Sequence, residues 1–154
     1  MIKINIKNQV LTYTNNNIKK LFSISTAMNG TGQQKGSFCT PIGRHIIRAM
    51  IGNNLPKCAI FKGRRWTGEV FDKNNFSLDN DYILTRILWL SGKEHGKNRL
   101  GSVDTMQRYI YIHGTHDEEN IGSPVSHGCI RMLNDDIIEL FNLVSYGENV
   151  EIIE

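Results

Sequence analysis

Isoleucine alternates with lysine and asparagine over residues 2–7, and this period of two is typical of a half-buried β-strand. A second strand is expected at residues 10–14 and a third at 18–25. Three consecutive asparagines at 15–17 separate them, and asparagine tolerates the positive φ of a turn. The opening of the chain is therefore predicted to be an antiparallel meander.

Strand-like apolar runs bounded by polar residues continue along the chain, at 44–51, 57–62, 69–71, 82–90 and 109–112. Between them lie two segments that are too polar and too rich in glycine to be strands, 29–36 and 91–101. Residues 40–43, Thr-Pro-Ile-Gly, are expected to form a tight turn, because proline sets one φ and glycine frees another. No repeat or linker interrupts this pattern, so we expect one domain, residues 1–154.

Only the segment that begins at Asn134 has the spacing of a helix. Apolar side chains at 137, 140, 141 and 144 recur at i, i+3, i+4 and i+7, which makes one stripe for the core. Asn134 is expected to be the N-cap, with two aspartates in the first turn, where the helix dipole favours negative charge. Gly147 marks the exit, and Val150 and Ile152 predict a closing strand. The expected fold class is mainly β with one packed C-terminal helix.

Composition and charge narrow the classes of function. With 154 residues, 40% apolar and 21% charged, the chain is long enough to bury a core without disulfides or metals. The formal charge of +3 suits an anionic partner, but no Lys/Arg cluster of the kind that follows nucleic-acid phosphates is present. Neither a bilayer-length apolar run nor a signal peptide is visible, so we expect a soluble protein that is not secreted by the usual route. Three cysteines leave at least one thiol outside any disulfide.

Three imidazoles, a thiol and a guanidinium are concentrated in residues 113–132. The predicted strand at 109–112 delivers His113 to the edge of a sheet, and the chain returns as Ser-His-Gly-Cys-Ile-Arg at 126–131. A thiol is a modest nucleophile until a base or a positive field raises its thiolate fraction. This stretch therefore predicts an acyl-transfer site with Cys129 as the nucleophile.

The roles of the neighbouring residues follow from their chemistry. His113 and His127 are both open as the base, because spacing alone does not separate them. Gly128 lets a substrate approach the backbone, whose free N–H groups could stabilise an oxyanion. If the segment is extended, Cys129 and Arg131 share a face, and Arg131 could bind a substrate carboxylate through two hydrogen bonds. Taken alone, these residues indicate a cysteine acyl-transfer enzyme of unknown substrate.

Other interpretations stay open at this point. The four candidate ligands of a zinc site are His113, His116, His127 and Cys129. Their spacing is not a common structural zinc pattern. Ser126 and Thr115 could simply satisfy loop backbone, and Cys39 and Cys58 are expected to be inert thiols that pack as small apolar side chains.

The motif at 126–131, preceded by His113 and Gly114, resembles the signature of the YkuD-type L,D-transpeptidases, which cross-link peptidoglycan. The further points of similarity are Ser25-Thr26 at the end of an early strand, Thr-Pro-Ile-Gly at 40–43, and Asn134 with Asp136 at the start of a helix. The similarity covers residues 2–153.

The resemblance implies an L,D-transpeptidase-like β-sandwich of mixed sheets with one packed helix after the cysteine motif. It implies that Cys129 attacks the carbonyl between a diamino acid and the terminal D-alanine of a stem tetrapeptide, releases D-alanine and passes the acyl group to an amine. The implied partners are peptidoglycan stem peptides or muropeptides, with no nucleic acid, membrane insertion, protein partner, metal or other cofactor. Members of the family are typically acylated by carbapenems and act in the cell envelope, outside the cytoplasmic membrane.

The resemblance also assigns roles to single residues. The implied catalytic set is Cys129, His113, His127, Gly114 and Gly128, and the implied substrate-binding set is Arg131, Ser126 and Thr115. His113 is the base in this assignment, and the carbonyl of Gly114 orients its ring. Two alternatives remain, an L,D-carboxypeptidase in which water resolves the thioester, and a catalytically silent peptidoglycan-binding module.

Overall fold

The computed structural model describes residues 1–154 and consists of ten strands, one α-helix and two short 3-10 helices. In chain order the elements are β1 (Ile2–Asn5), β2 (Val10–Asn15), β3 (Ile18–Ser25), β4 (Gly43–Ile51), β5 (Ala59–Lys62), β6 (Arg65–Val70), β7 (Ile83–Gly92), η1 (Gly101–Val103), β8 (Tyr111–Gly114), η2 (Glu118–Asn120), β9 (Ile130–Met132), α1 (Asn134–Leu143) and β10 (Asn149–Ile153). The mainly β fold with one α-helix is confirmed, and so is the opening meander of β1, β2 and β3.

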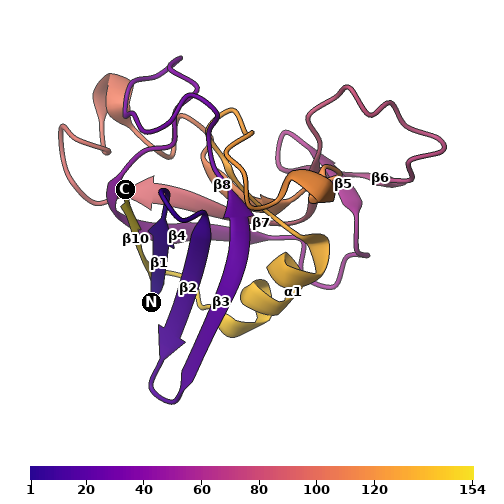
Figure 1. Ribbon diagram of the computed structural model, residues 1–154, viewed down its shortest axis with the longest axis horizontal. Coiled ribbons are helices and arrows are strands. Elements are labelled where there is room, and N and C mark those ends of the chain that lie inside the picture. The colour runs from indigo at the N-terminus through magenta and orange to yellow at the C-terminus, as the bar shows by residue number, and fades with distance from the viewer.

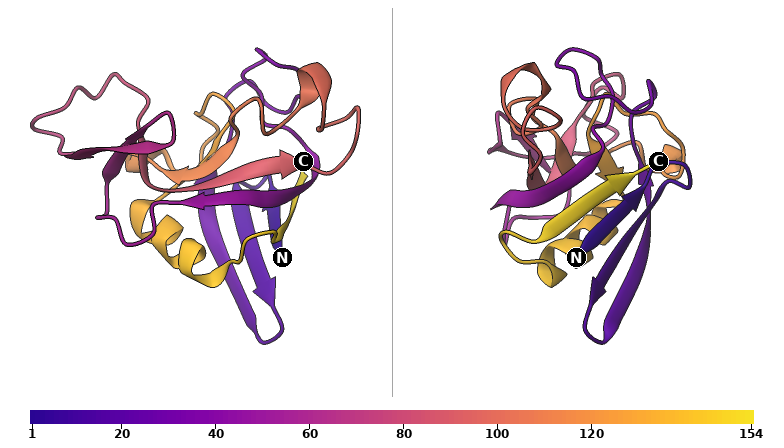
Figure 2. Two further views of the ribbon diagram at one scale, coloured as in Figure 1. Left: turned by 180° about the vertical axis from the view of Figure 1, so that it is seen from behind. Right: turned by 90° about the vertical axis from the view of Figure 1, so that its left-hand side faces the viewer.

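The strands form a mixed sheet that closes on itself. Its order is β4-β10-β1-β2-β3-β9-β8-β7, and β7 pairs back with β4, while β5 and β6 extend the sheet beyond β7. Strands β1, β2 and β3 run across the direction of β7 and β8, with α1 packed beside them (Figure 1). Strand β10 lies between β1 and β4, parallel to β1 (Figure 2). The ring is therefore closed by strands from both ends of the chain.

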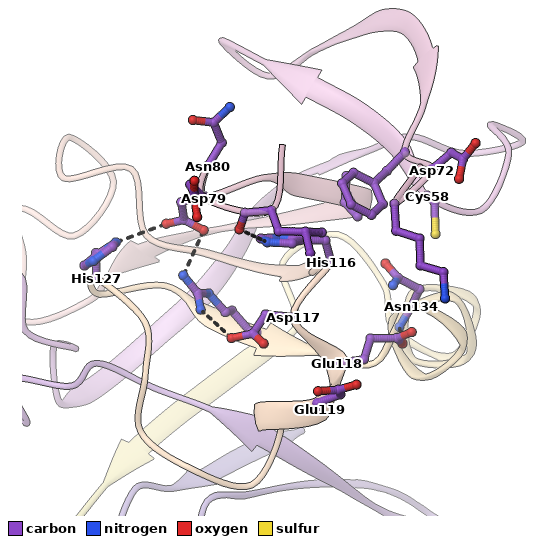
Figure 3. Close-up of a pocket in the computed structure, with 16 residues that line it drawn as sticks. Cys58, Asp72, Asp79, Asn80, His116, Asp117, Glu118, Glu119, His127 and Asn134 are labelled. Carbon is purple, nitrogen blue, oxygen red and sulfur yellow. Dashed lines mark hydrogen bonds and ion pairs between the residues drawn. The ribbon is translucent and has the colours of Figure 1, made fainter. Parts of the chain in front are cut away.

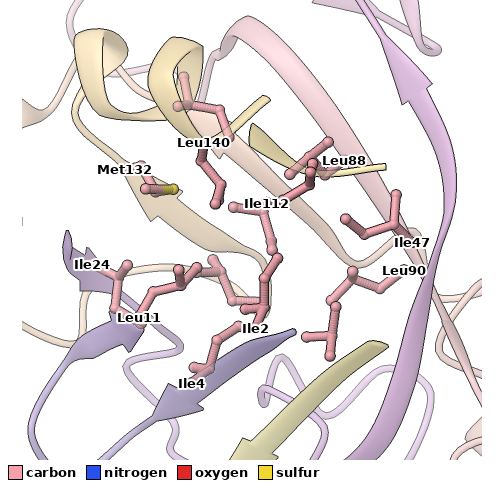
Figure 4. Packing of buried hydrophobic residues seen from close by; sticks show 14 of the residues in the cluster. Ile2, Ile4, Leu11, Ile24, Ile47, Leu88, Leu90, Ile112, Met132 and Leu140 are labelled. Atoms are coloured by element: carbon pink, nitrogen blue, oxygen red, sulfur yellow. The ribbon is translucent and has the colours of Figure 1, made fainter. Parts of the chain in front are cut away.

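Alternation along the strands places one apolar cluster inside this ring. Ile2 and Ile4 of β1 are fully buried, and they pair with Val150 and Ile152 of β10, which confirms the expected closing strand. The cluster contains 19 buried residues. Figure 4 shows how side chains from β1–β3, from β7 and from α1 meet around Ile112. Because each buried aliphatic side chain contributes about 1.5–3 kcal/mol, this core supplies most of the favourable free energy of folding.

The helix α1 buries the predicted stripe, but its start differs from the prediction. The N-cap position is Leu133, and no side chain caps the helix there. The Asn134 amide instead donates to the carbonyl of Thr115 (2.8 Å) and accepts from the Thr85 hydroxyl (2.6 Å). These buried groups need partners, and the Asn134 side chain is a partner of both. The N-cap assignment of Asn134 was therefore wrong. With ten residues, α1 is also too short to cross a membrane, and no other helix is long or apolar enough to do so.

Residues 40–43 do not form the expected tight turn. Thr40 forms a β-bridge with Thr31, and Gly43, at a φ of 102°, already begins β4. The side chain of Gln33 accepts from the N–H of Ile42 and donates to its carbonyl. Since Gln33 supplies these hydrogen bonds, the backbone of Ile42 does not need the pairing of a turn.

Candidate active site

The parallel pairing of β8 with β9 determines which side chains face the site. Ile112 pairs with Ile130, and both point into the core, so His113 and its partner Arg131 point to the opposite face. Cys129 precedes Ile130 and lies level with Tyr111, whose N–H donates to the Cys129 sulfur (3.3 Å). Because β8 is paired on both sides, by β9 and β7, His113 lies inside the sheet and not at its edge as predicted.

Cys129 is partly buried beside an apolar cluster that includes Tyr111. Its sulfur also lies 3.3 Å from the carbonyl of Tyr109, to which the thiol can donate. Burial raises the pKa of the Cys129 thiol to about 11, and the N–H of Tyr111 opposes this only in part. The thiol is therefore protonated near neutral pH.

His113 is almost fully buried, with 2% of its surface exposed. Its Nδ1 lies 2.5 Å from the carbonyl of Gly114, and since a carbonyl only accepts, Nδ1 must carry the proton. Burial lowers the pKa of His113, and the hydrogen bond to Gly114 opposes this shift. The result is a neutral imidazole with a free lone pair at Nε2, which is the form that a general base requires.

Gly114 is needed because the end of β8 is crowded. A Cβ there would lie 2.2 Å from Oδ1 of Asn134 and 2.8 Å from the carbonyl of Leu84. The Asn134 side chain therefore packs closely against the backbone of Gly114, whose carbonyl is the hydrogen-bond partner of His113. Sequence reasoning identified Gly114 and Asn134 but missed the contact between them.

Two of the proposed substrate-binding residues are turned inward. Thr115 is fully buried, and its hydroxyl accepts from the N–H of Asp117 (3.1 Å). Ser126 is 1% exposed, and its hydroxyl donates to the carbonyl of Cys129 (2.6 Å). Both hydroxyls are engaged within the protein, so direct substrate contact does not fit this arrangement. They hold the loop, which matches the plainer interpretation of these two residues.

The N–H groups around Cys129 differ in availability. The N–H of Gly128 donates to the Ser126 hydroxyl (3.2 Å), whereas the N–H groups of His127 and Cys129 make no hydrogen bond within the protein. Gly128 itself has a φ of 131°, and a Cβ there would lie 3.3 Å from the carbonyl of Cys39. The backbone at residues 127–129 therefore has two free donors and a position that requires glycine.

Arg108 holds the glycine-rich loop against this backbone. Its guanidinium donates to the carbonyls of Cys39 (2.7 Å) and Gly32 (3.1 Å), and the adjacent Thr40 hydroxyl donates to the carbonyl of Gly128 (2.9 Å). Burial lowers the pKa of Arg108. Nothing in the local sequence marks Arg108, because its partners lie about seventy residues earlier in the chain.

Arg131 and His127 share a carboxylate that the sequence did not reveal. Asp81 accepts from Nη2 of Arg131 (2.8 Å) through one oxygen and contacts Nδ1 of His127 (3.2 Å) through the other. Asp117 lies 3.9 Å from Nη1 of Arg131. The predicted common face of Cys129 and Arg131 agrees with the register, but the guanidinium is already paired.

Arg131 and His127 also line a cavity of about 910 Å³ that is rich in carboxylates. Figure 3 shows its wall, where Asp79, Asp117 and Glu118 surround the space. A smaller cavity of about 240 Å³ lies next to Tyr109, and His127 lines both cavities. Residues 91–101 line neither cavity.

The four residues of the zinc alternative are not gathered into a metal site. Nε2 of His116 lies 3.0 Å from the carbonyl of Leu78, and the His116 ring packs against Phe71 and Tyr82. No group of three or more His, Cys, Asp or Glu side chains is arranged to hold a metal ion.

Comparison with known proteins gives a consistent result. The model of the YkuD family, described as the L,D-transpeptidase catalytic domain, matches residues 1–152. The Bacillus subtilis protein named "Putative L,D-transpeptidase YkuD" is 54% identical over 46 residues, which make up 30% of this chain and 28% of that protein.

Solved structures agree on the fold. An L,D-transpeptidase from Mycobacterium smegmatis superposes with a TM-score of 0.57 at 16% identity, over 99% of this chain and 58% of its own. The L,D-transpeptidase LdtMt1 in complex with imipenem has a TM-score of 0.57 at 17% identity, over 99% of this chain and 57% of its own. At such identities the structures show a shared fold alone. The chain spans less than two thirds of each relative.

Proposed function

The chain belongs to the L,D-transpeptidase catalytic domain family, and from this premise we propose that it is a cysteine-dependent acyltransferase that acts on peptidoglycan stem peptides. Cys129 is the proposed nucleophile and His113 the proposed base. Arg131 and His127 form the wall on which the substrate lies.

The proposed reaction begins when the sulfur of Cys129 attacks the carbonyl carbon that joins the diamino residue to the terminal D-alanine. The thiol proton passes to Nε2 of His113, and the carbonyl electron pair moves to its oxygen. When the C–N bond breaks, His113 gives the proton to the departing nitrogen, so D-alanine leaves and a thioester remains. An amine of a second stem then attacks the thioester, its proton passes by way of His113 to the sulfur, and the thiol is restored.

The charge that develops on the carbonyl oxygen needs hydrogen-bond donors. The unpaired N–H groups of His127 and Cys129 support an oxyanion pocket at this backbone, since donors that are already oriented stabilise such a charge at little cost in reorganisation. Gly128 contributes its conformation, because its own N–H is held by Ser126.

The observation that carries the proposal is that the Cys129 thiol and the His113 imidazole lie on one face of the β8–β9 pair. Cys129 lies level with Tyr111, and His113 follows two residues later, which along a strand is about 7 Å. The hydrogen bond from Nδ1 to Gly114 leaves Nε2 of His113 free to take the thiol proton. An inert core thiol would not need this arrangement.

The test is to incubate the protein with a disaccharide tetrapeptide and to identify the products by mass spectrometry. We expect loss of D-alanine and formation of cross-linked dimers. Tripeptide without dimers would instead assign the L,D-carboxypeptidase reaction, in which water resolves the thioester. No change in the tetrapeptide, with folded and reduced protein, would favour a silent binding module.

A covalent probe tests the roles of the two histidines. Imipenem is expected to form a mass adduct on Cys129, and His113→Ala is expected to slow adduct formation about 10²-fold or more, the usual contribution of a general base. The matched variant His127→Ala should slow it less, since the backbone N–H groups of the oxyanion pocket remain. If His127→Ala is the silencing change and His113→Ala is not, the two roles are reversed.

We also propose that the protein works in the cell envelope, where its proposed substrate lies. Fractionation of cells that express the protein, followed by immunoblotting, would test this. Detection only in the cytoplasmic fraction would instead indicate that it handles soluble muropeptides.

A further inference from the structure

The guanidinium of Arg131 is already matched by carboxylates before any substrate arrives. Its side chain is 7% exposed, and it is paired with Asp81 at 2.8 Å and with Asp117 at 3.9 Å. Two carboxylates therefore face one guanidinium. Without His127, the charges of Arg131, Asp81 and Asp117 sum to about −1. Any charged group that enters the site meets this negative charge.

This charge lies where the side chain of the attacked residue would reach. Cys129 and Arg131 are two residues apart on one face, a spacing of about 7 Å along an extended chain. In the proposed reaction, the carbonyl attacked by Cys129 belongs to the diamino residue, whose side chain is three or four carbons long. Its end group can therefore lie beside the Arg131–Asp81 pair.

Two kinds of end group are chemically distinct at this place. A lysine or an amidated diaminopimelate presents an ammonium without a carboxylate, whereas unmodified diaminopimelate presents both. Asp81 would attract the ammonium and repel the additional carboxylate, and it also occupies Nη2 of Arg131, a donor that could bind that carboxylate. The wall of the cavity beyond, with Asp79 and Glu118, has the same sign.

We propose that Asp81 is a specificity-determining residue, which makes the site select donor stems whose diamino residue ends in an ammonium without a free carboxylate. The proposal rests on the proposed function. Asp81 acts on the substrate through its own charge and by neutralising Arg131. Its removal should release Arg131 to bind the carboxylate that the native site rejects.

The experiment compares two disaccharide tetrapeptides that differ only in whether the side-chain carboxylate of diaminopimelate is free or amidated. Both keep the carboxylate of the terminal D-alanine, so the ratio of their rates of D-alanine release at pH 7 isolates the side chain. The wild-type protein is expected to prefer the amidated donor about tenfold. In Asp81→Asn the preference should vanish or reverse, and Asp81→Glu should retain it.

Asp79→Asn is the matched control, because Asp79 lies on the same segment and lines the same cavity but makes no ion pair with Arg131. It should keep a ratio close to the wild-type value. Equal rates with the wild-type protein would overturn the proposal, and so would an unchanged ratio in Asp81→Asn. A loss of preference in Asp79→Asn as large as in Asp81→Asn would overturn it in favour of a diffuse field.

A second readout separates this inference from the proposed function. Binding of the same two peptides to the Cys129→Ala variant, measured by calorimetry, needs no catalysis. Failure of imipenem to label folded wild-type protein would count against the proposed function, while the ratio of the two affinities still tests Asp81. Equal affinities would overturn the inference even for an active enzyme.

Discussion

At the scale of single residues, the proposed nucleophile and the proposed base are held neutral by burial. The pKa of Cys129 is raised to about 11 and that of His113 is lowered, so an ion pair of thiolate and imidazolium is disfavoured before the substrate binds. In the proposed reaction, proton transfer then accompanies attack on the carbonyl, which is general-base catalysis.

This arrangement predicts the pH dependence of acylation by imipenem. The rate should be level from about pH 7 to about pH 9, because His113 is already neutral there, and should fall only below the ordinary histidine pKa of about 6.5. A reaction through preformed thiolate would instead accelerate about tenfold per pH unit up to the pKa of Cys129, near 11. Rates of adduct formation followed by mass spectrometry decide between the two profiles, and His127→Ala should leave the acid limb where it is.

The local sequence marked Cys129 and His113 as candidates, but not Asp81 or Arg108. A histidine at the end of an apolar run and a cysteine between glycine and arginine are visible within a few residues. Asp81 lies fifty residues before Arg131 in a polar segment, and only the fold brings the two together. The identity of the base was left open by spacing and now has support from the hydrogen bond to Gly114.

At the scale of elements, Asn134 joins the start of α1 to β7 and β8. It binds Thr85 and the carbonyl of Thr115, and its own N–H donates to Glu118 (2.9 Å). Sequence patterns predicted α1, β1–β3, β4 and β7 because alternation and helical spacing are local signals. The N-cap and the turn at 40–43 were predicted wrongly, because the Asn134 side chain is bound to Thr85 and Thr115, and Gln33 binds the backbone of Ile42.

Replacing Asn134 with alanine would leave the hydroxyl of Thr85 and the carbonyl of Thr115 buried without this partner. We expect the free energy of unfolding to fall by about 2–4 kcal/mol, as for other buried groups left unsatisfied. Asn142→Ala is the matched control, because Asn142 lies on the same helix and is exposed, and it should change stability by less than about 0.5 kcal/mol. Urea unfolding measures both, and equal effects would contradict the bridging role.

At the scale of the whole molecule, the closed sheet buries a histidine that has no part in the proposed chemistry. Nδ1 of His45 lies 3.0 Å from the carbonyl of Gly43, and Nε2 lies 3.0 Å from the hydroxyl of Thr105. Burial lowers the pKa of His45 to about 4. The unfolded chain would bind this proton near pH 6.5, so the contribution of His45 to stability is complete above that pH and declines as the pH falls to about 4.

The loss of stability over that interval should be roughly 3 kcal/mol from His45 alone, and His113 adds to it in the same direction. Chemical unfolding at about pH 7 and at about pH 4.5 measures the difference. His45→Gln should show a smaller dependence on pH, even if it is less stable at neutral pH. The same slope in His45→Gln and in the wild-type protein would contradict this origin.

The position of β10 has a consequence for how the protein is made. Because β10 fills the gap between β1 and β4, neither of these strands has its full set of partners until residues 149–153 have been synthesised. A nascent chain that lacks them presents two open strand edges, which are ready templates for pairing with other chains. Pairing of β10 covers both of these edges at once, so closure of the ring removes two templates for aggregation together.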